Sequence, residues 1–311
     1  MSNCLLRFIL SLLTADLFQF ICFASDDQVT MKFINPKFKE CPEVERKLGM
    51  ETVPEITLTN GGLFMSLSSS MASKLSLVGT AAGGHPNPHC ISHCGLIFLE
   101  RPSKILSIID GKVSGRIPSD YPVNTALLES VKEIIEQEYP SGSGREQIAA
   151  FGFAMDGIGI QGPGGGLILP FSRYTNWKLS LLVRNVRSPY RRKFTRAFIR
   201  RTLGMPKELD SYWDSLVGGG AARLIRGMCG VGSDTYVPKM WCSELMARFY
   251  GLNHPCSIVP SQFASVAGDD AVIGSDLFES EIPLRISFDF RSYVRATGDL
   301  TKMVLFVAGL I

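Results

Sequence analysis

The sequence predicts an α+β fold in which an antiparallel sheet packs against helices. Short apolar runs bounded by Gly or Pro, at residues 60–67 and 90–99, are typical of strands. Apolar residues recur at helical spacing over residues 126–139 and 191–203. With 311 residues, 45% of them hydrophobic and 20% charged, the chain has a globular composition and can bury a full core.

The simplest organisation is one domain with an extension at each end. We expect the domain over residues 51–265, an N-terminal extension over residues 1–50 and a C-terminal extension over residues 266–311. No uninterrupted apolar stretch reaches the length of about 18 residues that a membrane-spanning helix needs. The sequence also shows no internal repeat.

Residues 1–24 permit two interpretations. An apolar run after Arg7 and the small-x-small ending at Ala24 resemble a signal peptide. Asp16 interrupts that run, which favours an amphipathic or buried helix instead. Localisation therefore stays open: secreted or membrane-associated in the first interpretation, cytoplasmic in the second.

The region that follows predicts three strands. The first two are the apolar runs above, and residues 104–111 are predicted as a third strand that ends in an acidic turn. The segment Glu100-Arg101-Pro102-Ser103 is typical of a hairpin turn between the second and third strands. If these strands pair antiparallel, His93 and Asp110 lie on neighbouring strands, at the ends away from the turn.

The remaining elements are predicted from periodicity and from chain-breaking residues. Pro140 ends the first helix, and the Gly-rich residues 151–166 are predicted as a loop. The later elements are strands over residues 166–171 and 177–186, a helix over residues 191–203, and a helix over residues 242–251.

Cys242 lies at the predicted start of the last helix. The positive end of the helix dipole favours a thiolate over a thiol, and the thiolate is the nucleophilic form. This position therefore suits a catalytic cysteine. A buried, inert cysteine on the first turn of a helix is the alternative.

A histidine and a carboxylate strengthen the catalytic interpretation. His93 near the start of a strand could face Cys242, and Asp110 could orient the imidazole. Cysteine, histidine and aspartate in that arrangement are the minimum apparatus for acyl transfer through a thiol.

These motifs, in their order along the chain, resemble the circularly permuted papain-like branch of the NlpC/P60 superfamily, the YiiX-like cysteine hydrolases. The resemblance covers residues 55–265, and its motifs are individually short. The matching segments are Asn60-Gly61-Gly62-Leu63, Ser92-His93-Cys94-Gly95-Leu96, Ile109-Asp110, Leu169-Pro170-Phe171, Ser180-Leu181-Leu182-Val183-Arg184, Leu203-Gly204-Met205-Pro206 and Trp241-Cys242-Ser243-Glu244-Leu245.

The resemblance implies a papain-like, circularly permuted fold and a hydrolase or acyltransferase. Its target would be an amide or ester bond in a small molecule, a peptide, a cell-wall fragment or a lipid. Cys242 would be the nucleophile, His93 its partner, and Asp110 the best match to a third position that is usually Glu, with Glu100 as an outside candidate.

The sequence departs from the family pattern in two places. The Gly-Asp opening of the family is replaced by Asn60-Gly61-Gly62, and a Gly-rich insert surrounds Gly218-Gly219-Gly220. The missing Gly-Asp opening and the long extensions permit a second function class, a catalytically inactive relative that serves as a binding or structural protein.

Two motifs suggest ligands and are better explained without them. Residues 157–162 match G-x-G-x-x-G, but the following Pro163 and glycines cannot open the helix that a dinucleotide site needs, so no cofactor is expected. A zinc site is conceivable on His85, His89 and His93 with Cys90 and Cys94. The prolines between them and strand alternation separate these ligands, so no metal is expected either.

The net charge and the cysteine content bear on the expected partners and on the state of the thiols. A net charge of +3 gives no reason to expect nucleic-acid binding, and eight cysteines in no regular framework fit reduced thiols better than a disulfide scaffold. Eight Lys and Arg residues fall within 184–201. They form either a solvated helix face or a docking surface for an anionic membrane.

Overall fold

The protein has an α+β fold built on a six-stranded antiparallel sheet, which confirms the predicted class. The computed structural model describes residues 27–34, 55–67, 91–119, 121–157, 164–177, 180–206, 242–253, 255, 258–264 and 276–286. The predicted N-terminal signal peptide or helix and the insert near Gly218 lie outside the described residues.

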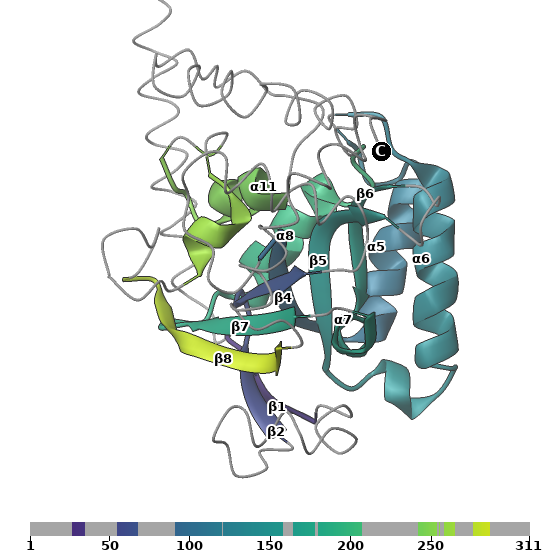
Figure 1. Ribbon diagram of the computed structural model, residues 1–311. Coiled ribbons are helices and arrows are strands. Elements are labelled where there is room, and N and C mark those ends of the chain that lie inside the picture. The colour runs from purple at the N-terminus through teal and green to yellow at the C-terminus, as the bar shows by residue number, and fades with distance from the viewer. Residues whose placement is uncertain are drawn as a thin grey trace, which may run out of the picture.

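Every neighbouring pair in the main sheet is antiparallel. A separate two-stranded ribbon lies beside it (Figure 1). In spatial order the sheet consists of β6 (Gly164–Pro170), β5 (Ala149–Gly157), β4 (His93–Glu100), β3 (Leu63–Leu67), β7 (Ser180–Val186) and β8 (Phe278–Ile286), and the ribbon consists of β1 (Thr30–Ile34) and β2 (Glu55–Thr59).

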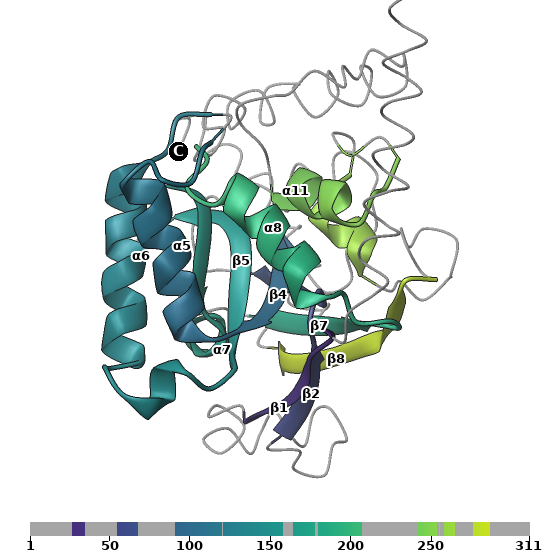
Figure 2. The same ribbon diagram turned by 180° about the vertical axis from the view of Figure 1, so that it is seen from behind.

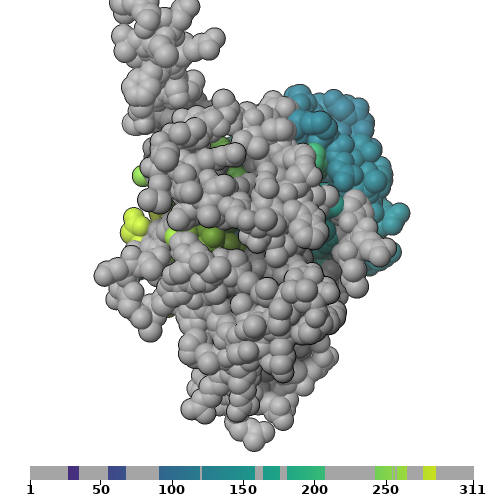
Figure 3. Space-filling view, turned by 45° about the horizontal axis from the view of Figure 1, so that its top comes forward, coloured from purple at the N-terminus to yellow at the C-terminus, as the bar shows by residue number. Residues whose placement is uncertain are grey.

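Helices cover both faces of the main sheet, but unequally. Figures 1 and 2 show the short α7 (Phe171–Trp177) on one face and the other labelled helices on the opposite face. These other helices are α5 (Pro102–Val113), α6 (Thr125–Glu138), α8 (Arg192–Thr202) and α11 (Cys242–Phe249). Figure 3 shows the region of α5 and α6, in blue-green, at the surface of the molecule. None of the helices in the described ranges is long and apolar enough to cross a bilayer.

The predicted third strand at residues 104–111 is wrong, because this segment belongs to helix α5. Pro102 occupies the first turn of the helix, where its missing N–H costs nothing, so the segment after β4 starts a helix and not a hairpin. The buried residues Ile105, Ile108 and Ile109 follow helical spacing, which the Ile-rich composition of the run disguised.

The predicted loop at residues 151–166 is also wrong, because strands β5 and β6 occupy most of it. Gly152 in this segment allows an aromatic ring to approach the sheet closely. A Cβ atom on Gly152 would collide with the ring of Tyr174, and one on Gly95 in β4 would collide with Phe64. Here glycine indicates ring packing against a strand, as glycine inside strands often does.

The folded unit extends into both predicted extensions. Strand β8 pairs with β7 at the edge of the main sheet, although it lies in the range assigned to the C-terminal extension. At the other end, Asp27 accepts hydrogen bonds of 2.8 Å from the Arg192 side chain and from the Lys193 backbone N–H.

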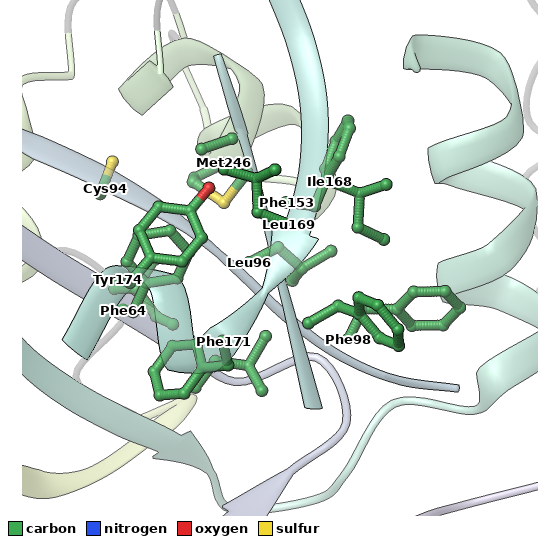
Figure 4. Close-up of a cluster of buried hydrophobic side chains, with 14 of the residues drawn as sticks. Phe64, Cys94, Leu96, Phe98, Phe153, Ile168, Leu169, Phe171, Tyr174 and Met246 are labelled. Carbon is green, nitrogen blue, oxygen red and sulfur yellow. The ribbon is translucent and has the colours of Figure 1, made fainter. Parts of the chain in front are cut away.

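Apolar side chains on both faces of the sheet and on the helices that cover them form one buried cluster. Figure 4 shows aromatic and aliphatic side chains from several strands meeting there, together with Met246 of α11. The Phe64 ring packs against Tyr174 with centroids 4.5 Å apart, and Phe153 packs edge-on against Phe198 of α8. Such pairs stabilise beyond the burial of their area.

A buried amide joins three segments of this core. The Asn60 side chain accepts a hydrogen bond of 3.0 Å from the Leu99 N–H and donates bonds of 2.7 Å to the Tyr190 carbonyl and 3.1 Å to Thr195 Oγ1. Asn60 is completely buried, so no water replaces a lost partner. The turn after β2, the end of β4 and the start of α8 are thereby held in one arrangement.

We expect Asn60→Ala to lower the free energy of unfolding by about 3 kcal/mol, because the buried Leu99 N–H and the partly buried Tyr190 carbonyl lose their partner. Urea denaturation followed by circular dichroism measures this change. Gln147→Ala removes an amide that is exposed. It should cost less than about 0.5 kcal/mol. Equal effects of the two variants would contradict the role assigned to Asn60.

Candidate active site

Cys242 is the first residue of helix α11, as the sequence predicts. The two residues after it are fixed by hydrogen bonds: Ser243 Oγ donates to the Ile258 carbonyl at 2.5 Å, and Glu244 accepts from Arg248 at 2.9 and 3.1 Å. Helix α11 packs against β4 and β5 through its apolar side. The thiol is thus held at a fixed place next to the start of β4.

The first two residues of β4 both contact this thiol. The sulfur of Cys242 lies within hydrogen-bonding reach of the His93 imidazole, of the Cys94 thiol and of the Cys94 backbone N–H. His93 and Cys242 are each 8% exposed, and Cys94 is completely buried. The structure therefore brings Cys242 and His93 together and adds Cys94, which sequence reasoning considered only as a zinc ligand.

These contacts shift the pKa values of the two thiols in opposite directions. Hydrogen bonding from Cys94, together with the charge and hydrogen bond of His93, holds the pKa of Cys242 well below its usual value, against the opposing effect of burial. Burial and the neighbouring Cys242 raise the pKa of Cys94 well above its usual value. The helix start and the neighbouring imidazole therefore favour the thiolate at Cys242, and burial favours Cys94 as the hydrogen-bond donor.

The carboxylate nearest the imidazole belongs to Asp156, near the end of β5. Its Oδ2 atom lies 3.4 Å from His93 Nε2, within ion-pair distance once the ring is protonated. At that distance Nε2 makes no aligned hydrogen bond within the described part of the chain. Asp156 Oδ1 accepts a bond of 2.9 Å from the Gly157 N–H, which orients the carboxylate.

Sequence reasoning missed Asp156 because β5 was interpreted as a loop. The β4–β5 register pairs Leu96 with Phe153. Continued toward the start of β4, the same register puts Asp156 opposite His93. Directly opposite residues of antiparallel strands lie close together, so recognition of β5 as a strand would have found this carboxylate.

The structure does not bring Asp110 to His93. Asp110 lies near the end of α5, half exposed, and its Oδ1 accepts a hydrogen bond of 2.7 Å from Lys132 of α6. Because α5 is a helix, the predicted hairpin that would have put Asp110 on a strand beside β4 does not exist.

Glu100, the outside candidate, is at the far end of the strand from His93. It is the last residue of β4, about 23 Å from the first at the usual rise per residue. Its buried carboxylate is held by Arg196, whose Nε donates at 2.7 Å and whose terminal nitrogen makes a second, shorter contact. Glu100 therefore fixes α8 to the sheet.

The other ligand candidates lie partly outside the described residues. His85, His89 and Cys90 of the zinc hypothesis are outside them, as are residues 158–163 of the Gly-rich motif. In the described part of the chain no three His, Cys, Asp or Glu side chains are arranged to hold a metal ion.

Several of the Lys and Arg side chains of residues 184–201 are buried or paired with carboxylates, so they are not available to a membrane surface. Arg184 is buried and donates to the carbonyls of Phe263 at 2.8 Å and Glu279 at 3.1 Å. Arg192 and Arg196 pair with Asp27 and Glu100 as described above. The exposed cations of the segment are Arg187, Lys193, Arg200 and Arg201.

A groove of about 510 Å³ lies away from the cysteine, between β2, β7 and β8. Its lining includes Ile56, Asn185 and Glu279. Neither Cys242 nor His93 contributes to it, so it is not part of the candidate active site.

Compared with known proteins, the chain matches no family model, no curated protein and no solved structure. The chemistry of the site therefore has to be inferred from the geometry of Cys242, His93 and Asp156.

We expect Cys94→Ala to raise the pKa of Cys242, because the thiolate loses a buried hydrogen-bond donor. The rate of alkylation by iodoacetamide, measured against pH and assigned to Cys242 by peptide mapping, reports this pKa. Cys94→Ser keeps a donor and should shift the profile less. An unchanged profile in Cys94→Ala would contradict the assigned hydrogen bond.

Proposed function

We propose that the protein is a thiol hydrolase or acyltransferase that cleaves an amide or ester bond through Cys242, His93 and Asp156. The observation that carries the proposal is the contact between a thiol at a helix N-terminus and an imidazole whose Nε2 faces a carboxylate. Nucleophile, base and orienting group are the three parts that this chemistry needs.

In the first step the Cys242 thiolate attacks the substrate carbonyl. Since Nε2 of His93 faces Asp156, Nδ1 is the nitrogen left to hold the thiol proton. The imidazolium then protonates the leaving amine or alcohol, and an acyl-enzyme remains. Water releases the acyl group in a hydrolase, and another nucleophile releases it in an acyltransferase.

Two features of the site favour charge separation in this step. Asp156 stabilises the imidazolium that forms when the thiol gives up its proton. Cys94 donates to the thiolate through its thiol and through its backbone N–H. The backbone N–H of Cys242, at the start of α11, is the natural first donor to the oxyanion of the tetrahedral intermediate.

A papain-like, circularly permuted fold is part of the same proposal. The strand with His93 precedes the helix with Cys242 along the chain, and that helix packs against an antiparallel sheet. This order and packing support the resemblance to the permuted NlpC/P60 branch. By that resemblance, the substrate is a peptide, a cell-wall fragment or an acylated lipid.

We expect Cys242→Ala and His93→Ala each to abolish labelling by a thiol-directed acyl probe, because one lacks the nucleophile and the other its base. Mass spectrometry of the labelled peptide measures the loss, and circular dichroism checks that the variants fold. Labelling at Cys242 that is undiminished in His93→Ala would support an inactive binding or structural protein instead.

The two aspartates separate the proposed triad from the one expected from the sequence. Asp156→Asn should slow labelling on the order of 10- to 1000-fold, because the imidazolium loses its counter-charge. Asp110→Asn should leave the rate unchanged, since Asp110 is bonded to Lys132 on the outer helices. The same probe, followed over time, measures both rates, and the opposite ranking would restore Asp110 to the site.

A further inference from the structure

We propose that Cys94 and Cys242 form a reversible oxidation site for hydroperoxides, in which Cys242 is the thiol attacked first and Cys94 the thiol that resolves it into a disulfide. The inference rests on the proposed function in one respect: it assigns a regulation to the same nucleophile. It starts from the observation that the thiols of Cys94 and Cys242 are in contact, while the acyl-transfer steps require only that of Cys242.

The two thiols come from different elements and meet within the protein. Cys94 is the second residue of β4, Cys242 is the first residue of α11, and the helix packs directly on the strand. Both are free thiols in hydrogen-bond contact. A disulfide needs such proximity, since its Cα atoms lie about 4.4–6.8 Å apart.

The surroundings give the two sulfurs different roles. Cys242 is buried but still 8% exposed, beside the imidazole of His93, so it is the more accessible of the two thiols. Cys94 is completely buried among core side chains and has no such access (Figure 4). The accessible thiolate is oxidised, and the buried thiol follows because its partner is already in contact.

In the first step the Cys242 thiolate attacks the outer oxygen of the hydroperoxide and the O–O bond breaks. The sulfur becomes a sulfenic acid, and the alkoxide or hydroxide that leaves takes a proton from the His93 imidazolium. In the second step the Cys94 sulfur attacks the sulfenic sulfur, an S–S bond forms, and the hydroxyl leaves as water with the Cys94 proton. The peroxide is the two-electron oxidant, and both thiols are reduced again by an external dithiol.

The consequence is protection together with inhibition. While the disulfide lasts, Cys242 cannot attack a carbonyl. It also cannot proceed to the sulfinic acid, which ordinary thiols do not reduce. Without Cys94 the sulfenic acid has no neighbouring thiol among the described residues, because these contain only Cys94 and Cys242 as cysteines.

The test treats the full chain with a few equivalents of hydrogen peroxide, blocks the remaining thiols and maps the digested peptides by mass spectrometry. The wild-type protein should yield a cross-link between Cys94 and Cys242 and should lose acyl-probe labelling, and dithiothreitol should reverse both changes. Cys94→Ser, which keeps a hydroxyl donor, should give no cross-link. With dimedone present, its Cys242 should be recovered as the dimedone adduct. Without dimedone, the same cysteine should advance to a sulfinic acid that dithiothreitol does not restore.

Two results would overturn the inference: oxidation of wild-type Cys242 to sulfinic acid without a cross-link, or a cross-link from Cys242 to another cysteine such as Cys90. Labelling of the untreated protein is scored separately. Acyl-probe labelling without the cross-link would support the proposed hydrolase and reject Cys94 as a resolving thiol. The cross-link without labelling would support Cys94 as a resolving thiol and reject the proposed hydrolase.

Discussion

The geometry of the site depends on the aromatic packing that holds α11 against the rest of the protein. Phe249, at the end of this helix, packs against Tyr190 and Phe198 with ring centroids 4.9 and 5.0 Å apart. The next residue, Tyr250, packs on Phe278 of β8 and donates a hydrogen bond of 3.0 Å to the Gly61 carbonyl. Because one end of the helix is fixed to three parts of the fold, the other end can present Cys242 at a defined place.

The same packing makes the site part of the core. Cys94 is at once a core side chain and the hydrogen-bond donor to Cys242, so its direction is set by close packing and not by a flexible loop. The His93 ring is also held by core packing, since its centroid lies 6.4 Å from that of the Phe64 ring. Groups held in this way need little reorganisation when charge moves between sulfur and imidazole.

Periodicity in the sequence predicted most helices and strands, but the carboxylate expected beside His93 was Asp110, whereas the structure places Asp156 there. The helix at 126–139, the strand with His93 and the helix that starts at Cys242 could be predicted because each has a clear apolar repeat and a clear stop. The run around Ile105 and Ile109 was ambiguous because β-branched residues favour strands, while its burial follows a helix. Strand β5 could not be recognised because its glycine makes room for Tyr174, which only the folded protein reveals.

Within the described ranges β8 is one of the two edges of the sheet that carries the site, and its sequence disfavours pairing with a further strand. Pro283 lies within it and lacks an N–H, two register shifts interrupt its pairing with β7, and Glu279 adds an exposed charge. A further strand would gain few hydrogen bonds there and would bury a carboxylate. Although β8 completes the packing around Tyr250, it therefore offers a poor template for edge-to-edge aggregation between copies of the protein.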